Sequence, residues 1–452
     1  MTASPADLPR RFLDHLRVSG LFEEPGKALV AMSGGPDSRA LLELFVRVAD
    51  EIDVTPVIGH VDHGIANDSA AWADTVRRAA ARHGVPCWVE RLHLGAGTSE
   101  TVARPARYRA LRGLQRRHGA PYLVTGHHAD DQVETVLLRV LRGSGVAGLA
   151  GISARGPCGL RRPLLPFRRA ELVTWLDEAV PDHAAIVDPS NVDPRHDRSW
   201  IRRYLLPVAR ERFPDVDHRL LALAQDAADH RAAWAIAVGQ FPDLDFRVIE
   251  GGVEVARPPL RSYDKVLSHA ILRAVARQAG CVLGRPRAAR LLEFAAAQSG
   301  RVMPLGDGWM AEIVFHRLRI HRAPERPTAH PPDAVGWGGA ASGEASWDGW
   351  CITWGAAEAQ RVRREGWTTW VTRGEGMVRA VRTGDRIRPV GGVGRRKVRR
   401  LLMEQRVPRS ERRRWPVLER DGDIVWVPGI CRSAAALPRP GEAALRVDAH
   451  RR

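Results

Sequence analysis

Short apolar runs alternate with amphipathic stretches between residues 27 and 167. The apolar runs predict strands at 27–32, 55–61, 86–92 and 121–125. Apolar positions three and four residues apart predict helices at 37–49, 69–83, 102–117 and 130–142. Strands that alternate with helices through short links favour a parallel sheet covered on both faces. We therefore expect a doubly wound α/β fold, in which ligands bind beyond the carboxyl ends of the strands.

The pattern changes after this region. A helix is predicted at 169–179, the segment 216–300 is mostly helical, and 301–322 has the pattern of short strands. Proline and glycine cluster in 323–346, which is typical of a linker. We expect an α/β catalytic domain, a mostly helical substrate-binding domain, a linker and a small basic α+β domain, at 1–215, 216–325, 326–376 and 377–440.

Charge and cysteine content narrow the class of protein. The chain of 452 residues has a formal net charge of +17, which favours a polyanionic partner. The excess is concentrated between Arg379 and Arg414, where 14 Lys and Arg residues face three acidic ones. Five scattered cysteines form no Cys-X-X-Cys pair, which argues against a zinc knuckle or a disulfide framework. With no apolar run long enough to span a membrane, a cytoplasmic protein is expected.

The first candidate site follows the strand predicted at 27–32. Ser33-Gly34-Gly35-Pro36-Asp37-Ser38 places a tight glycine turn directly before a helix, so that backbone N–H groups can point at an anion. No Gly-Lys-Ser/Thr follows, so this is not a Walker A loop. The pattern Ser-Gly-Gly-X-Asp-Ser is similar to the loop with which ATP pyrophosphatases release pyrophosphate from ATP.

A second cluster of ionisable residues follows the strand predicted at 121–125. The segment from Gly126 to Thr135 reads Gly-His-His-Ala-Asp-Asp-Gln-Val-Glu-Thr. In a helix that begins near Asp130, Asp131 and Glu134 share one face near its start. Carboxylates there also complement the helix dipole, and adjacent histidines seldom form a complete metal site, so the segment alone leaves a structural role open.

Together the two motifs resemble the tRNA(Ile)-lysidine synthase family, a branch of the ATP pyrophosphatase (PP-loop) group with an adenine nucleotide alpha hydrolase-like fold. Further matching segments are 61–64 with Ser69, 100–108, 137–145, 162–165, 188–191, and the C-terminal run from 385 to 418. Two positions depart from the family pattern. Asn67 and its two predecessors stand where a basic residue is common, and Ser199 replaces an asparagine.

The resemblance implies a two-step reaction on an isoleucine tRNA with the anticodon CAU. The wobble cytosine is adenylated by ATP with release of pyrophosphate, and L-lysine then attacks C2 and displaces AMP. ATP is a substrate, Mg²⁺ is expected, and the protein is a monomer or a homodimer.

The site residues implied by the resemblance fall into four groups. The catalytic residues are Asp37, Asp131, Glu134 and Arg107. ATP is bound by Ser33, Gly34, Gly35, Pro36, Asp37, Ser38, His60 and Gly126, with Asp37 as a Mg²⁺ ligand. Lysine and AMP are bound by Arg104, Arg107, Asp131, Glu134 and Arg198. Transfer RNA is held by Arg202, Arg395, Arg396, Lys397, Arg399 and Arg400, in a C-terminal run that also contains Trp415.

Three alternative functions remain at this point. A tRNA thiolase uses the same loop, but it needs a persulfide or clustered cysteine ligands, which five dispersed cysteines do not supply. A small-molecule synthetase with this loop leaves the basic C-terminal stretch unexplained. A non-catalytic RNA-binding protein has no need of intact Asp37, Asp131 and Glu134.

Overall fold

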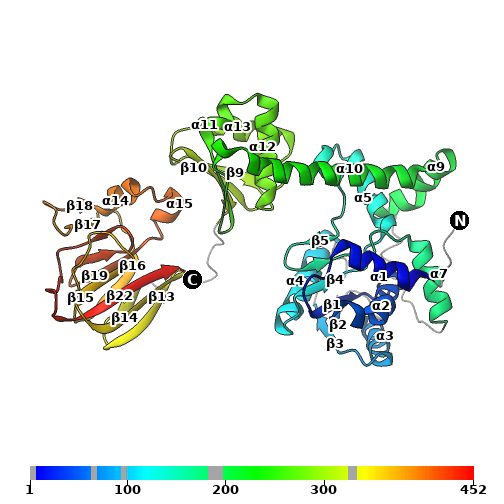
Figure 1. The fold of residues 1–452 in the computed structure, drawn as a ribbon, viewed down its shortest axis with the longest axis horizontal. Coiled ribbons are helices and arrows are strands. Elements are labelled where there is room, and N and C mark those ends of the chain that lie inside the picture. The colour runs from blue at the N-terminus through cyan, green and yellow to red at the C-terminus, as the bar shows by residue number, and fades with distance from the viewer. Residues whose placement is uncertain are drawn as a thin grey trace. The chain divides into compact units, whose positions relative to one another are not determined.

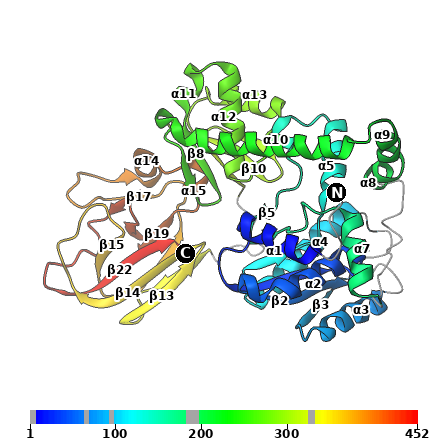
Figure 2. The same cartoon turned by 45° about the vertical axis from the view of Figure 1, so that its right-hand side comes forward.

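The computed structural model describes residues 7–62, 69–92, 98, 100–181, 197–323 and 333–451. Two compact units divide the chain, Met1–Ala233 and Trp234–Arg452 (Figures 1 and 2). No helix among the described residues is long and apolar enough to cross a membrane.

The first unit contains one mixed sheet and most of the helices. Its strands are β1 (Gly26–Met32), β2 (Val54–Asp62), β3 (Cys87–Arg91), β4 (Tyr122–Val124), β5 (Arg155–Gly156) and β6 (Leu160–Arg161). Its helices are α1 (Leu8–Ser19), α2 (Pro36–Val48), α3 (Ser69–Arg82), α4 (Glu100–Arg117), α5 (Ala129–Leu141), α6 (Val146–Leu149), α7 (Arg169–Ala179), α8 (Asp197–Trp200) and α9 (Leu206–Arg212). The helix α10 (Val216–Ala237) begins in this unit and ends in the second.

The order of the strands reverses at the centre of the sheet. The order is β3-β2-β1-β4-β6-β5, and all neighbours are parallel except β5 and β6. The chain runs outward from β1 to β3 and then returns to the other side of β1 as β4. A ligand site is expected where the carboxyl ends of β1 and β4 diverge.

Both faces of the sheet are buried, which explains why its strands read as continuous apolar runs. Ala28 and Val30 of β1 pack with α1, α2 and α7, whereas Leu29 between them packs with Leu111 and Leu114 of α4. Helices therefore cover both faces, and the predicted doubly wound fold is confirmed together with its first four strands and helices.

The second unit begins with an α+β region. An antiparallel sheet has the order β7-β8-β11-β10-β9, from strands β7 (Arg247–Ile249), β8 (Gly252–Ala256), β9 (Val302–Gly306), β10 (Trp309–Val314) and β11 (Arg317–Arg322). Its core is shared with α11 (Arg257–Ser262), α12 (Lys265–Gln278) and α13 (Arg285–Phe294). The expectation of a mostly helical 216–325 missed β7 and β8, because strands of three and five residues give too short a periodic signal.

Two further antiparallel sheets share one tryptophan-rich core near the C-terminus. One has the order β12-β16-β19-β20-β21, from β12 (Ala334–Trp337), β16 (Gly376–Ala380), β19 (Pro416–Arg420), β20 (Asp423–Val427) and β21 (Cys431–Arg432). The other has the order β13-β14-β22-β15, from β13 (Ser342–Trp347), β14 (Trp350–Glu358), β15 (Thr368–Thr372) and β22 (Ala443–Arg451). A short ribbon of β17 (Arg386–Ile387) and β18 (Arg396–Lys397) precedes α14 (Val398–Glu404) and α15 (Arg409–Arg412).

The expected linker at 326–376 is therefore wrong for its described part, 333–376. Four strands, β12 to β15, lie there. β12 pairs with β16, β13 with β14, and β14 and β15 with β22 near the end of the chain. Their glycine-rich sequence reads as a linker, but two of the glycines, Gly343 and Gly376, lie opposite tryptophans in the strand ladders.

Candidate active site

The Ser-Gly-Gly loop and the start of α5 meet at the reversal point of the sheet. The loop follows β1, and residues 125–128 connect β4 to α5. Gly126 makes this approach possible, because a Cβ atom on it would lie 3.3 Å from the backbone oxygen of Asp37 and 3.5 Å from Cα of Ser38. Two motifs far apart in the sequence thus form one site, as predicted.

Side-chain hydroxyls hold the Ser-Gly-Gly loop in shape. Ser38 Oγ accepts a hydrogen bond from the Ser33 N–H at 3.2 Å and donates one to the Gly35 oxygen at 3.0 Å. Gly34 has φ +88°, a conformation that favours glycine. Gly35 is the N-cap of α2 and Pro36 its first residue, so the helix begins directly at the loop. This geometry is that of an anion cradle at a helix N-terminus.

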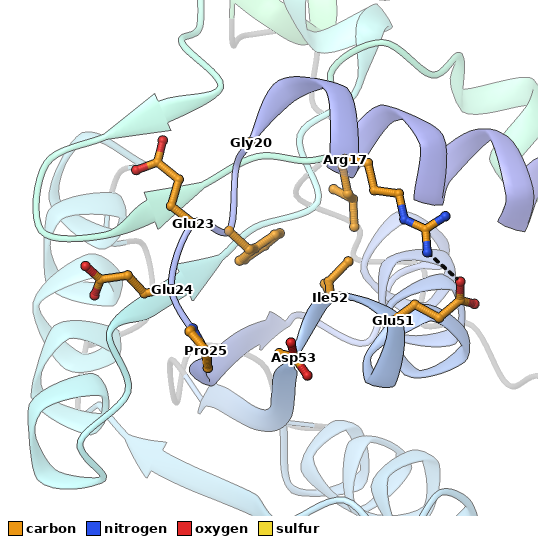
Figure 3. Close-up of a pocket in the computed structure, with 10 residues that line it drawn as sticks. Arg17, Gly20, Glu23, Glu24, Pro25, Glu51, Ile52 and Asp53 are labelled. Atoms are coloured by element: carbon orange, nitrogen blue, oxygen red, sulfur yellow. Dashed lines mark hydrogen bonds and ion pairs between the residues drawn. The ribbon is translucent and has the colours of Figure 1, made fainter.

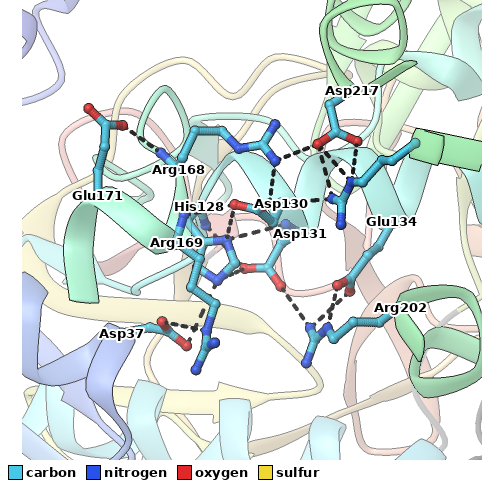
Figure 4. A network of polar contacts seen from close by, with 11 residues as sticks. Asp37, His128, Asp130, Asp131, Glu134, Arg168, Arg169, Glu171, Arg202 and Asp217 are labelled. Atoms are coloured by element: carbon cyan, nitrogen blue, oxygen red, sulfur yellow. Dashed lines mark hydrogen bonds and ion pairs between the residues drawn. The ribbon is translucent and has the colours of Figure 1, made fainter. Parts of the chain in front are cut away.

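Helix α5 begins with an unusual cap. The side chain of His128 accepts a hydrogen bond from the Asp131 N–H at 3.3 Å, and Asp131 Oδ2 accepts one from the His128 N–H at 3.1 Å. The other ring nitrogen of His128 lies 3.8 Å from Asp37 Oδ2 and 3.5 Å from Asp131 Oδ2 (Figure 4). His128 therefore connects the carboxylate of the loop with the carboxylate at the start of α5.

Burial and neighbouring charges shift the pKa values of His128 and Asp37 in opposite directions. Burial acts to lower the pKa of His128, but the contact with Asp37 and the charges of Asp131, Asp37 and Asp130 raise it above its ordinary value. Burial acts to raise the pKa of Asp37, yet His128, Arg169 and Arg202 together lower it. Because Nδ1 of His128 accepts the Asp131 N–H, the ring proton lies on Nε2, the nitrogen that faces Asp37 and Asp131.

Glu134 is placed one turn further along α5 and is 2% exposed. Its carboxylate accepts hydrogen bonds from Nε and Nη2 of Arg202 at 2.5 and 3.0 Å. Burial raises the pKa of Glu134, and the bond from Arg202 limits that rise. The same bond raises the pKa of Arg202. Glu134 was expected to hold an ammonium group and Arg202 to hold tRNA; the structure pairs them with each other because a carboxylate this deep needs a cation.

A second set of ion pairs, absent from our expectations, fixes the surrounding helices. Arg168 contacts Asp130 at 2.7 Å and Asp217 at 2.5 Å, and Arg210 contacts Asp217 at 3.0 Å (Figure 4). These residues connect α5 with the chain before α7, α9 and the first turn of α10. They hold these elements together around the start of α5.

Arg169 begins α7 and reaches the loop. Its Nε lies 3.1 Å from Asp37 Oδ1. A sequence signal for this role exists, since cations in the first turn of a helix oppose its dipole and need another partner. Arg168 and Arg169, at the start of the helix predicted at 169–179, give such a signal.

His127 faces the opposite charge environment from His128. Its Nδ1 lies 3.0 Å from Thr125 Oγ1. Burial, followed by the charges of four arginines, lowers the pKa of His127 to about 3, so the ring is neutral at pH 7. The four are Arg162, Arg104, Arg107 and Arg198. Arg104, Arg107 and Arg198 were expected to bind the lysine carboxylate or AMP. Their positive charges disfavour protonation of the His127 ring.

Arg198 and Arg202 belong to a continuous helix with an irregular turn. The helix runs through α8 and α9, and Ile201–Leu205 between them form a π turn in which the Leu206 N–H bonds the Ile201 oxygen. Arg198 donates to Thr135 Oγ1 at 3.1 Å. π turns are frequent at functional sites, and this one carries Arg202.

His60 ends up inside the protein near the loop. It lies on β2, is buried, and its Nδ1 contacts the Met32 oxygen at 2.8 Å. Burial lowers the pKa of His60. We had expected a direct ATP contact; the structure places the ring where it supports the end of β1. Of the other matching segments, 63–64, Asn67 and 188–191 lie outside the described residues.

The donor set fits a magnesium ion only if substrate supplies most ligands. Among the described residues no group of three or more His, Cys, Asp and Glu side chains could hold a metal. Mg²⁺ beside a triphosphate needs only one or two carboxylates. Asp37, whose side chain is 30% exposed in the first turn after the loop, meets that requirement.

A separate cavity of about 240 Å³ lies at the other end of the strands (Figure 3). It is lined by residues that precede β1 and β2, including Glu23, Glu24, Glu51 and Asp53. Four carboxylates repel a triphosphate, so this cavity is not a candidate for the nucleotide site.

The C-terminal basic stretch is less free than its sequence indicates. Arg379 is buried against Asp385 and Glu419, and Trp415 is buried with its N–H on the Pro428 oxygen. Of the five cations in this stretch that were expected to meet tRNA, three are ion-paired at the surface: Arg395 with Asp423, and Arg396 and Arg400 with Glu404. Lys397 and Arg399 are exposed, and no ion pair to another described residue involves them.

Comparison with known proteins identifies the family of this chain. Residues 10–209 match a PP-loop domain model, and residues 377–449 match the TilS substrate C-terminal domain. A tRNA(Ile)-lysidine synthase of Alkalilimnicola ehrlichii is 33% identical over 98% of this chain and 97% of its own length. That of Symbiobacterium thermophilum is 31% identical, with 96% of each chain covered.

Among solved structures, a tRNA thiolase from Methanococcus maripaludis is 16% identical, with a TM-score of 0.42 over 49% of this chain and 78% of that chain. The near-complete coverage by relatives at more than 30% identity decides the assignment. The chain belongs to the tRNA(Ile)-lysidine synthase family.

Proposed function

We propose that the protein ligates L-lysine to C2 of the wobble cytidine in a CAU-anticodon isoleucine tRNA, at the expense of ATP. The observation that carries this proposal is the meeting of the Ser-Gly-Gly loop, which ends at the N-terminus of α2, with Asp37, His128 and Asp131 at one end of the sheet. Full-length relatives bear the corresponding name.

In the first step the cytosine O2 attacks the α-phosphorus of ATP, and the bond to pyrophosphate breaks. The Ser33–Gly35 loop and the N-terminus of α2 would hold the phosphates and stabilise the charge that develops on them. Asp37 would hold a Mg²⁺ ion, which would supply further charge neutralisation. Arg169 would then give up its contact with Asp37.

In the second step the lysine amine attacks C2, the C2–O bond breaks, and AMP leaves. The amine must lose a proton, and Asp131 or Glu134 would accept it. Glu134 is a stronger base than an ordinary glutamate, because burial raises its pKa. We assign the arginines around His127 to the lysine carboxylate or the leaving AMP, since guanidinium forks suit both anions.

The test uses purified protein, ATP, Mg²⁺, labelled lysine and an unmodified CAU-anticodon isoleucine tRNA. Label should enter the tRNA only with ATP present, and Asp37→Ala should abolish it. AMP and pyrophosphate should appear in equal amounts. Incorporation of sulfur from cysteine in place of lysine would refute the proposal in favour of a thiolase.

A further inference from the structure

A second cavity, of about 560 Å³, lies in the C-terminal tryptophan-rich domain. Its lining comes from β12, β14 and β16 and the turns beside them. The wall residues are Gly336, Trp337, Gly339, Ala340, Trp354, Glu375, Gly376 and Met377. The size suits one flat heterocycle with its sugar, and the mixture of aromatic wall and few polar groups is that of a small-ligand pocket.

Glycines create the aromatic wall of this pocket. Trp354 on β14 lies opposite Gly343 on β13, and a Cβ atom on Gly343 would come within 2.5 Å of the indole ring. The ring therefore lies flat over a residue without a side chain. It is half-buried, and its N–H is bonded to the Ala340 oxygen at 3.1 Å. An indole fixed in this way offers a face for stacking.

Trp337 forms part of the wall of the same pocket. It pairs with Gly376 across the β12–β16 ladder and is almost wholly buried. A Cβ atom on Gly376, itself in the pocket wall, would lie 2.7 Å from Nε1 of Trp337. This nitrogen is buried beside the Gly376 backbone, so Trp337 contributes apolar surface to the pocket and no donor to a ligand.

Glu375 and Met377 add a carboxylate and a thioether to the lining of the pocket. A Cβ atom on Gly339 would be 3.1 Å from Glu375 Oε1, which places the carboxylate beside the pocket floor. Met377 is 43% exposed and adds a polarisable thioether at the rim. A carboxylate acceptor beside a stacking face matches a nucleobase that carries an amino group.

We propose that this pocket binds one unpaired, amino-bearing nucleobase of the tRNA, stacked on Trp354, with its amino group on Glu375. The RNA as occupant rests on the proposed function. Arg373, exposed two residues before Glu375, supplies a cation for the neighbouring phosphate. Carboxylates select against uracil, which has no amino group.

The test compares CMP with UMP as probes on the full-length protein, by ligand-observed NMR titration. The wild type should bind CMP about fivefold or more tighter than UMP, because only cytosine can donate an amino hydrogen bond to the Glu375 carboxylate. Glu375→Gln should bring that ratio near one, and Trp354→Ala should weaken both nucleotides, whereas Trp354→Phe retains the ring and the binding. Glu358→Gln, an exposed glutamate on β14, is the matched control and should leave the ratio unchanged.

A second arm measures lysine transfer to tRNA. Trp354→Ala should raise the KM for tRNA about tenfold, the usual effect of losing one stacked base, with unchanged affinity for ATP. Asp37→Ala, which removes the reaction, should leave the CMP preference intact. Equal binding of CMP and UMP by the wild type, or no binding of either at millimolar concentration, would overturn the pocket assignment. Failure of lysine transfer by the wild type would refute the proposed function alone, because the nucleotide arm does not depend on it.

Discussion

The guanidinium of Arg202 closes over the carboxylate of Glu134 with two hydrogen bonds, so that Glu134 is 2% exposed while the arginine side chain remains 46% exposed. This difference in exposure predicts how much stability is lost when the pair is broken. Glu134→Gln should lower the free energy of unfolding by about 1–2 kcal/mol, less than for a wholly buried pair because Arg202 is solvated. Urea unfolding of Glu134→Gln, of a variant without the Arg202 guanidinium and of the double variant measures the coupling free energy between the two side chains. Strictly additive effects would contradict a direct pair.

Gly126 is the point of closest approach between the two motifs. Gly126→Ala should leave the unfolding midpoint nearly unchanged and reduce the rate of pyrophosphate release about tenfold, because the new methyl group pushes on the Asp37 backbone at 3.3 Å. Gly113→Ala serves as the control, since a Cβ atom there meets no atom within 4 Å. Equal activity of the two variants would show that the loop tolerates the displacement.

Arg169 and Mg²⁺ should compete for the same carboxylate. Arg169→Ala is expected to lower the Mg²⁺ concentration that gives half-maximal activity, because Asp37 loses a cation held at 3.1 Å. Asp37→Asn should reduce activity by about 10²-fold or more at any Mg²⁺ concentration. Arg17→Ala, which breaks an ion pair with Glu51 outside the site, is the control. An unchanged Mg²⁺ requirement in Arg169→Ala would contradict the competition.

His127 should make the protein sensitive to acid. Its pKa falls from 6.5 to about 3 on folding, so below pH 6.5 the unfolded chain binds a proton that the folded protein does not. The free energy of unfolding then decreases by up to about 1.4 kcal/mol per pH unit as pH falls toward 3.

His127→Gln should therefore lose less stability than wild type between pH 6 and pH 4, as followed by thermal melting. His218→Gln, at an exposed position on α10, should follow the wild type. Parallel curves for His127→Gln and wild type would mean that the ring is protonated in the folded state.

Exposed cations near α14 should differ in their effect on tRNA. Lys397→Ala and Arg399→Ala should each raise the KM for tRNA. Each should also reduce, by about one, the slope of the logarithm of the tRNA binding constant against the logarithm of the salt concentration. Arg396→Ala should do less, because its guanidinium is held by Glu404 at 2.6 Å. Filter-binding titrations at several salt concentrations decide this. Equal slopes for all three variants and wild type would remove this stretch from the RNA interface.

The sequence was sufficient for the sheet of the first unit and for the meeting of its two motifs. Strands buried on both faces give long apolar runs, and the rule on strand ends then places the Ser33 loop beside His128. Such signals are local and need no knowledge of distant residues.

Pairings between distant residues could not be predicted in the same way. Arg202 reads as one cation among many, and only the tertiary structure shows that it neutralises Glu134. The strands at 334–372 were missed because three of the four, β12, β14 and β15, pair with β16 or β22, up to about a hundred residues away, and glycine and serine there mask the alternation. Arg379 and Trp415 likewise looked available until their burial was known.

The π turn at Ile201–Leu205 has a consequence for how this helix tolerates insertions and deletions. A π turn holds one residue more than an α turn, and each residue of an α-helix rotates the chain by about 100°. Deleting one residue there would restore regular winding but rotate the residues before the turn, Arg198 among them, relative to α9. The angle between Arg198 and α9 thus depends on one surplus residue, and length changes in the family should avoid this helix.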